Sequence, residues 1–170
     1  SSYPRLTWNP LPGADQYDLW INSVSPAKNP FVRITNLNQS TWTSSTAFPM
    51  GQYQAWVRGI AADGTSVTWS ERFDFHVSPT PVLTTAANLA FSGLPTITWN
   101  AIAGAVRFDV WVDNASTGTS PFDRASVVGT TYTPSKTFGI GKYRFWVRSI
   151  DAAGTMSAWS SRLEFSVNTP

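Results

Sequence analysis

The sequence contains no cysteine, a single histidine and few charged side chains. Without cysteine the chain has no disulfide, no thiolate nucleophile and no thiolate metal ligand, so its stability must come from packing. Twelve basic and ten acidic residues give a net charge of +2 and are scattered along the chain. This pattern argues against nucleic-acid binding. No apolar run approaches the ~20 residues of a membrane span, so we expect no membrane insertion.

The residue patterns of enzymes and metal sites are also missing. His76 alternates outward near the end of a strand-like segment, and Ser166 replaces it in the second half of the chain. We interpret it as a solvated edge residue, because a catalytic triad would need this histidine in a sheltered pocket. The fragments Asp63-Gly64 and Asp113-Asn114 lack calcium-loop spacing, and the glycines occur singly at turns instead of forming a phosphate loop. We therefore predict no catalytic residue, no metal, no cofactor and no enzymatic activity.

The chain is rich in aromatic residues, and several of them belong to an internal repeat. Nine tryptophans, ten phenylalanines and five tyrosines occur in 170 residues. The offset is 91 residues for the first two pairs of the repeat and 90 for the other four, so a whole folding unit has been duplicated. We predict two domains, residues 1–79 (unit 1) and 80–170 (unit 2). The six repeated pairs are Asp18 and Asp109, Trp20 and Trp111, Trp56 and Trp146, Arg58 and Arg148, Trp69 and Trp159, and Arg72 and Arg162.

Apolar and polar residues alternate with a period of two, which is typical of strands. In unit 1 we expect Leu19 and Ile21 to face the core while Asp18 and Trp20 face outward. The segment 53–59 places Trp56 and Arg58 on an outer face in the same way, and 73–77 directs its phenylalanines inward. No segment has a helical stripe. The sequence therefore predicts an all-β chain of two tandem seven-stranded antiparallel β-sandwiches.

The two units differ at their beginnings. In unit 2 the segment Asn88-Leu-Ala-Phe91 is typical of a first strand, whereas unit 1 has only Ser1 to Pro4 at the equivalent place. We expect unit 1 to lack its opening strand and the chain to come from a longer tandem array. An unpaired sheet edge recruits strands from neighbours, which leaves open dimers formed by edge pairing, or a first strand supplied by another chain.

The chain resembles the fibronectin type III family, a group of immunoglobulin-like β-sandwiches, over essentially its whole length. The resemblance rests on Leu6-Thr-Trp8 and Ile97-Thr-Trp99, on the closing pairs Trp69-Ser70 and Trp159-Ser160, and on the aromatic residues before the sixth strands. It implies that Tyr53 and Tyr143 form the family's tyrosine corner. The Trp-Ser pairs also resemble half of the WSXWS signature of cytokine receptors, with an arginine in place of the second tryptophan.

The outward tryptophans and arginines allow three interpretations. In the first, Trp56, Arg58, Trp69 and Arg72 stack as alternating rungs of a structural ladder, with Asp18 in an exposed pair with arginine, and unit 2 repeats this; cation–π contacts contribute roughly 0.5–2 kcal/mol each. In the second, the tryptophans form a platform for sugar rings. In the third, they pack between domains or chains. Arg58 and Arg148 favour the ladder, because we expect them to cover Trp56 and Trp146. The ladder residues are the twelve repeated ones given above.

Two functions are compatible with these patterns. The first is a non-catalytic structural or adhesive spacer, or a protein-binding module, of a larger extracellular or cell-surface protein, as the family resemblance implies. Its partners would be other domains of that protein or extracellular proteins. The alternative is a carbohydrate-binding accessory module of a polysaccharide-acting protein. A cytokine-type receptor is disfavoured by the absence of cysteine. Glycoside hydrolysis needs two carboxyl groups roughly 5–10 Å apart, and the repeated set offers one clear candidate per unit, Asp18 or Asp109.

Overall fold

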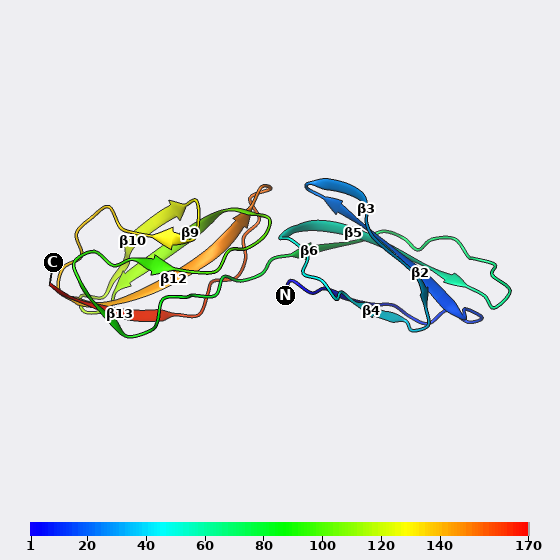
Figure 1. Ribbon diagram of the computed structural model, residues 1–170, viewed down its shortest axis with the longest axis horizontal. Helices are drawn as coiled ribbons and strands as arrows, with labels where there is room; N and C mark the ends of the chain where they lie inside the picture. Colours follow the sequence, from blue (N-terminus) through cyan, green and yellow to red (C-terminus); the bar gives the residue numbers. More distant parts are fainter. Residues whose placement is uncertain (170) are drawn as a thin grey trace. The chain divides into compact units, whose positions relative to one another are not determined.

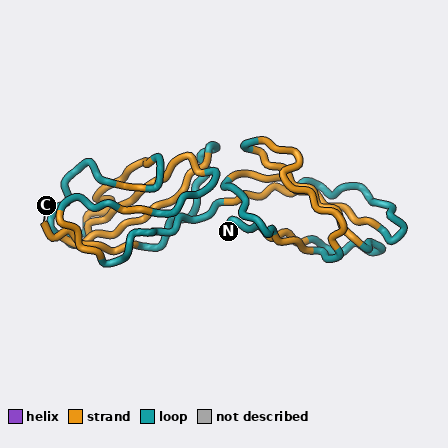
Figure 2. The backbone as a smooth tube through the Cα atoms, viewed as in Figure 1, coloured by secondary structure: helices purple, strands orange, loops and turns teal. Residues whose placement is uncertain are grey.

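The computed structural model describes residues 1–169 and divides into two compact units, Ser1–Val77 and Ser78–Pro170. Each unit consists of strands joined by turns and loops (Figures 1 and 2). The described residues include no helix of the length and apolar character that crossing a membrane requires. The all-β fold predicted from the alternation of residues is therefore confirmed.

Unit 1 has two sheets. One pairs β1 with β4, and the other has the order β3-β2-β5-β6 with antiparallel neighbours. The strands are β1 (Arg5–Thr7), β2 (Gln16–Val24), β3 (Ala27–Leu37), β4 (Thr41–Thr43), β5 (Gly51–Ile60) and β6 (Phe73–Val77).

Unit 2 repeats this arrangement with one additional strand. Its sheets have the orders β11-β8 and β10-β9-β12-β13-β7. The strand β7 pairs with β13 in parallel, which differs from the purely antiparallel arrangement predicted from the sequence. The strands are β7 (Leu89–Ser92), β8 (Ile97–Thr98), β9 (Ala105–Asn114), β10 (Thr119–Val127), β11 (Thr131–Tyr132), β12 (Gly141–Asp151) and β13 (Leu163–Thr169).

The core of each unit is formed by the inward side chains of its sheets. Leu19 and Ile21 of β2 are buried in unit 1, and Val110 and Val112 of β9 are buried in unit 2, as the alternation predicts. Their neighbours in the chain face the other side of the sheet because successive side chains of a strand alternate. The residues that carry the candidate site therefore lie on the outer face of the larger sheet.

The final strands show what the additional strand contributes. Leu163 of β13 is 2% exposed, whereas the equivalent Phe73 of β6 is 57% exposed. The prediction that Phe73 packs in the core is therefore wrong. Among the described residues of unit 1 no strand pairs with the free edge of β6, whereas β7 pairs with β13 from Phe165 onward. Phe73 and Leu6 instead line an open hollow of about 300 Å³. Residues 1–77 thus contain no counterpart of β7, as predicted.

Candidate functional site

Strand β2 lies at the centre of the candidate site in unit 1, with β3 on one side and β5 on the other. The strand register places Asp18 opposite Arg58, and Trp20 opposite Trp56, both on β5. On the other side, Trp20 lies opposite Arg33 of β3. Because directly opposed residues share a face of the sheet, these five side chains project together.

Strand β9 builds the same arrangement in unit 2. Asp109 lies opposite Arg148, and Trp111 lies opposite Trp146, both on β12. Arg124 of β10 is opposite Trp111 on the other side. The duplication has therefore preserved both the residue types and their strand register.

The carboxylate of Asp18 joins two arginines in unit 1. Its Oδ2 atom accepts hydrogen bonds from Arg33 Nη2 at 3.0 Å and from Arg58 at 3.0 Å (Nη2) and 3.2 Å (Nε). The carboxylate is only 1% exposed, although it lies on the outer face. The expectation of an exposed ion pair is therefore wrong: the two guanidinium groups remove the carboxylate from solvent.

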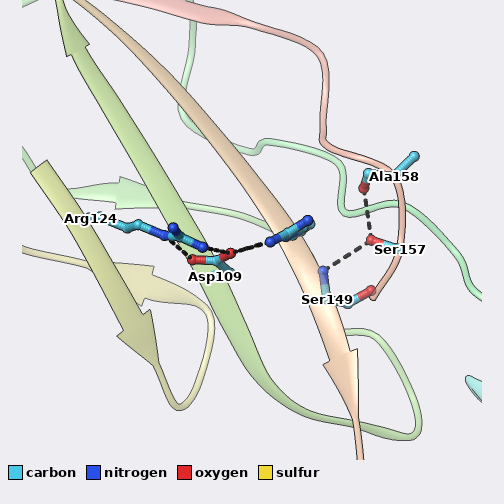
Figure 3. Close-up of polar contacts among 6 residues, drawn as sticks. Asp109, Arg124, Ser149, Ser157 and Ala158 are labelled. Atoms are coloured by element: carbon cyan, nitrogen blue, oxygen red, sulfur yellow. Dashed lines mark hydrogen bonds and ion pairs between the residues drawn. The ribbon is translucent and has the colours of Figure 1, made fainter. Parts of the chain in front are cut away.

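Asp109 occupies the same position in unit 2, where Arg124 reaches it from the neighbouring strand (Figure 3). Its Oδ2 atom accepts from Arg124 Nη2 at 3.1 Å and from Arg148 at 2.7 Å (Nη2) and 3.0 Å (Nε). Burial raises the pKa of this carboxyl, but the hydrogen bonds and charges of Arg124 and Arg148 outweigh burial and lower the pKa of Asp109 below its usual value. The carboxylate is thereby held in its ionised form.

A tryptophan from the segment between β5 and β6 covers the central arginine of unit 1. The segment is fixed to β5 because Ser70 N donates to Val57 O at 2.8 Å and Val57 N donates to Ser70 Oγ at 3.1 Å. This reciprocal pair places Trp69 over Arg58, with 4.6 Å between the guanidinium carbon and the ring centroid. The serine after the tryptophan thus has a definite role in positioning it.

Two further ring contacts close the arrangement in unit 1. Trp20 meets Trp69 edge-on, with 6.3 Å between ring centroids, and Arg33 lies over Trp20 at 5.0 Å. With Trp69 in place of Trp56, the five side chains form a closed cycle in which each contacts two of the others. We call this set cluster 1: Asp18, Trp20, Arg33, Arg58 and Trp69.

Cluster 2 has the same connections in unit 2. Arg148 lies over Trp159 at 4.4 Å, Trp159 meets Trp111 edge-on at 6.3 Å, and Arg124 lies over Trp111 at 5.5 Å. The segment that carries Trp159 is held to β12 by a serine, as in unit 1, and Figure 3 shows this segment running beside β12 at Ser157 and Ala158. Cluster 2 consists of Asp109, Trp111, Arg124, Arg148 and Trp159.

A shallow hollow lies beside each cluster. In unit 1 it has a volume of about 350 Å³ and is lined by Trp20, Trp56, Trp69, Asn22 and Asn29. The indole N–H of Trp20 donates to Asn22 Oδ1 at 2.7 Å and to Asn29 Oδ1 at 3.1 Å. Three half-buried indoles and two amides therefore form its walls.

The equivalent hollow of unit 2 has a volume of about 330 Å³. Trp111, Trp146 and Trp159 line it together with Asp113 and Ser160. The indole N–H of Trp111 donates to Asp113 Oδ1 at 2.7 Å. The aromatic walls are the same in both units, and the polar residue next to the first tryptophan changes from an amide to a carboxylate.

Comparison with solved structures identifies the fold. A two-domain fibronectin type III segment of chicken tenascin superimposes with a TM-score of 0.65 and 14% identity, covering 97% of this chain and 92% of that one. Each unit has the fibronectin type III fold. The FN1–FN3 domains of chicken contactin match with a TM-score of 0.44 and 14% identity, over 99% of this chain and 63% of that one. No protein-family model matches the sequence, and neither does any curated protein.

The tyrosines assigned to the fibronectin type III corner donate hydrogen bonds to the chain four residues earlier. Tyr53 Oη donates to Pro49 O and Tyr143 Oη donates to Gly139 O, each at 2.9 Å. Burial raises the pKa of Tyr53 to about 12 and also raises the pKa of Tyr143. Both hydroxyls therefore stay protonated and serve as donors at neutral pH, in the geometry that the family resemblance implies.

Two of the predicted ladder positions in each fibronectin type III unit lie outside the clusters. Arg72 pairs with Asp74 at 3.0 Å, and Arg162 pairs with Glu164 at 3.2 Å, so the structure places neither in the ring stacks. Trp56 is not covered by Arg58, which turns to Asp18 and Trp69 instead.

Trp146 of unit 2 is likewise left without its expected cover, since Arg148 lies over Trp159. The prediction that Arg58 and Arg148 cover Trp56 and Trp146 is therefore wrong. Arg58 and Arg148 turn away from these rings because a buried carboxylate on the neighbouring strand attracts a guanidinium group more strongly than does a ring two residues away on the same strand.

Sequence reasoning missed the second arginine of each cluster. Arg33 and Arg124 are themselves 91 residues apart, the same offset as Asp18 and Asp109. The repeat therefore contained the signal, but alternation alone does not identify β3 and β10 as the strands that flank the aspartates.

The remaining candidates for chemistry are dispersed. His76 is exposed near the end of β6. Within residues 1–169, no group of three His, Cys, Asp or Glu side chains is arranged to hold a metal ion. The two clusters and the hollows beside them are thus the features that the units share beyond their fold.

Proposed function

We propose that the chain is a pair of non-catalytic spacer or protein-interaction modules of a larger extracellular or cell-surface protein. The observation that carries the proposal is the closed contact cycle of each cluster, in which one carboxylate, two guanidinium groups and two indoles satisfy one another. Such a cycle braces three neighbouring strands without a disulfide. It suits a unit whose task is to keep its shape.

The state of the cluster carboxylate also supports a non-catalytic role. A general acid works best when its pKa lies near the operating pH. Asp109 has a lowered pKa because two arginines donate hydrogen bonds to it. A carboxyl group held ionised in this way is poorly suited to give up a proton, and its oxygens are already occupied by protein donors.

The residues at the junction of the units support the spacer role. Residues 78–81, with which unit 2 begins, include Pro79 and Pro81 and no glycine. Proline-rich connections favour an extended and semi-rigid chain. The partners that we propose are neighbouring domains of the same protein, or extracellular proteins bound by the loops, in keeping with the fibronectin type III resemblance.

Single-molecule energy transfer between dyes tests the spacer role. Because the chain has no cysteine, Ser45→Cys and Ser135→Cys give one exposed labelling position in each unit. We expect a single narrow distribution of transfer efficiency. The control is the same labelled chain with Pro79→Gly and Pro81→Gly, for which the distribution should broaden. Equally broad distributions for both proteins would refute a stiff spacer.

The alternative function, a carbohydrate-binding accessory module, is favoured by one observation. A platform for sugar rings needs an aromatic ring face that no side chain covers. Trp56 and Trp146 line the hollows, and no cation or second ring lies over them among the described residues.

A further inference from the structure

We propose that the hollow beside each cluster binds a pyranose ring of a neutral glycan, with Trp56 in unit 1 and Trp146 in unit 2 as the stacking surface. This site goes beyond the spacer role and rests on the alternative function above, for which it names the ligand class and the stacking residues. The clusters use two tryptophans in each unit, and the repeat retains a third that they do not use. A duplicated, half-buried indole on an outer face calls for a role other than bracing.

The size and the aromatic walls of the hollows suit a sugar ring. Their volumes of about 350 and 330 Å³ lie at the low end of the range for ligand sites, about 300–1,000 Å³. Three indoles form the walls in each case. An indole face is flat and apolar with a negative quadrupole, and the C–H face of a pyranose is flat and slightly positive, so the two surfaces are complementary.

The polar groups at the rim match sugar hydroxyls. The indole N–H of Trp20 donates to the Oδ1 atom of Asn22 and to that of Asn29. The NH₂ groups of the two asparagines remain as donors beside the hollow. In unit 2, one oxygen of Asp113 accepts from Trp111, and its second oxygen remains an acceptor. A hydroxyl group both donates and accepts, so a polyol can bind to either rim.

Charge separates a glycan from a cationic ligand. A cation bound between indoles would profit from Asp113 in unit 2, but unit 1 has neutral Asn22 in that position. Arg33 and Arg58 lie over Trp20 and Trp69, two of the indoles that line the hollow of unit 1, and their charges disfavour a cation there. A neutral, hydroxylated ring is the chemistry that both hollows accept.

Isothermal titration calorimetry and intrinsic tryptophan fluorescence test the site on the whole chain. The probes are cellohexaose, chitohexaose, xylohexaose and mannohexaose. We expect at least one of them to bind saturably with a Kd at or below about 1 mM, with two sites per chain and a change in tryptophan emission. No heat and no emission change with any probe at about 10 mM would overturn the proposal.

Variants locate the binding in the hollows. Trp56→Ala combined with Trp146→Ala should weaken binding by about tenfold or more, because each stacking contact is lost. Trp56→Phe with Trp146→Phe keeps a ring and should bind with intermediate affinity, which also guards against a double alanine variant that fails to fold. The matched control is Tyr3→Ala, which removes an exposed aromatic residue outside the hollows and should bind normally.

Two results would contradict the assignment. Equal affinity of the double phenylalanine variant, the folded double alanine variant and the wild type would place the sugar elsewhere. Saturable binding of tetramethylammonium with no response to the hexasaccharides would show that the ligand is a cation. The dye measurement of spacer stiffness is unaffected by either result, so failure of the glycan site and failure of the spacer role can be told apart.

Discussion

Replacement of Arg58 by alanine is the most direct test of the cluster as a structural brace. Arg58 donates two hydrogen bonds to Asp18 and stacks over Trp69 at 4.6 Å. Arg72 offers a matched control, since the sequence predicts the same role for it but it pairs with Asp74 at 3.0 Å while 55% of its side chain is exposed. Both variants therefore remove an arginine side chain, Arg58→Ala from the closed cycle of cluster 1 and Arg72→Ala from an exposed ion pair.

The expected magnitude follows from these contacts. Hydrogen bonds to a charged group contribute about 1.5–3 kcal/mol, and a cation–π contact contributes about 0.5–2 kcal/mol. Arg33 still pairs with Asp18 in the variant, so we take the lower part of the sum and expect unit 1 to lose about 2–3 kcal/mol. An exposed pair such as that of Arg72 contributes about 0–1 kcal/mol.

Native-state hydrogen exchange separates the two units within the intact chain. For Arg58→Ala we expect the slowest amides of β2 and β5 to exchange roughly 30- to 150-fold faster, because each 1.4 kcal/mol corresponds to a factor of ten. The amides of β9 and β12 serve as the internal reference and should not change. If Arg58→Ala and Arg72→Ala had the same small effect, within about 0.5 kcal/mol, the cluster would not be a brace.

Three further predictions concern other features of the units. The lowered pKa of Asp109 makes a stabilising contribution that is fully present above its unfolded value of about 3.9 and is lost as the pH falls through the lower folded value; urea unfolding of unit 2 below about pH 4 should show this loss, and Asp109→Asn should abolish it. Placing a copy of residues 84–91 before Ser1 should stabilise unit 1 by about 1–2 kcal/mol, because the copied phenylalanine would pack against Phe75 as Phe91 packs against Phe165 in unit 2; a scrambled segment of the same composition should have no effect on the urea midpoint. Tyr53→Phe removes one buried hydrogen bond and should lower the unfolding free energy of unit 1 by about 1 kcal/mol, and an unchanged urea midpoint would show that the corner hydrogen bond contributes nothing.

The fold could be predicted because the evidence for it is local and repeated. Alternation around Leu19 and Ile21 recurs around Val110 and Val112, and all four residues are buried. A strand that buries one face must alternate in this way, so the alternation identifies the core residues of these strands. The sequence also predicts that residues 1–77 contain no counterpart of the first strand of unit 2, since this follows from comparing the two copies.

The candidate site could be predicted only in part because it depends on which strands are neighbours. Asp18 contacts Arg33 and Arg58 across two strand pairs, and alternation along one strand does not say what lies opposite. For the same reason, the burial of Asp18 was missed, since an outward side chain is assumed to meet water. The contact of Arg58 with Trp69 additionally required the serine that fixes the intervening segment to β5.

The exposure of Phe73 could not be predicted from its own segment either. The residue has the alternation of a core position, but its side chain is largely exposed, and alternation along β6 does not say which other segments lie over that face. The general lesson from these residues is that alternation specifies which side of a sheet a residue faces, while its environment on that side depends on contacts that are distant in sequence.

The closed cycle of contacts has a consequence for how the two copies diverge. Since every member of a cluster touches two others, a substitution at one position disturbs the partners on both sides, and a single replacement elsewhere cannot restore them. The five positions therefore drift apart only through coordinated changes, which are rare. This coupling gives a physical reason why the copies still agree at all five positions after other parts of their sequences have become dissimilar, and it predicts strong epistasis in any library that varies them.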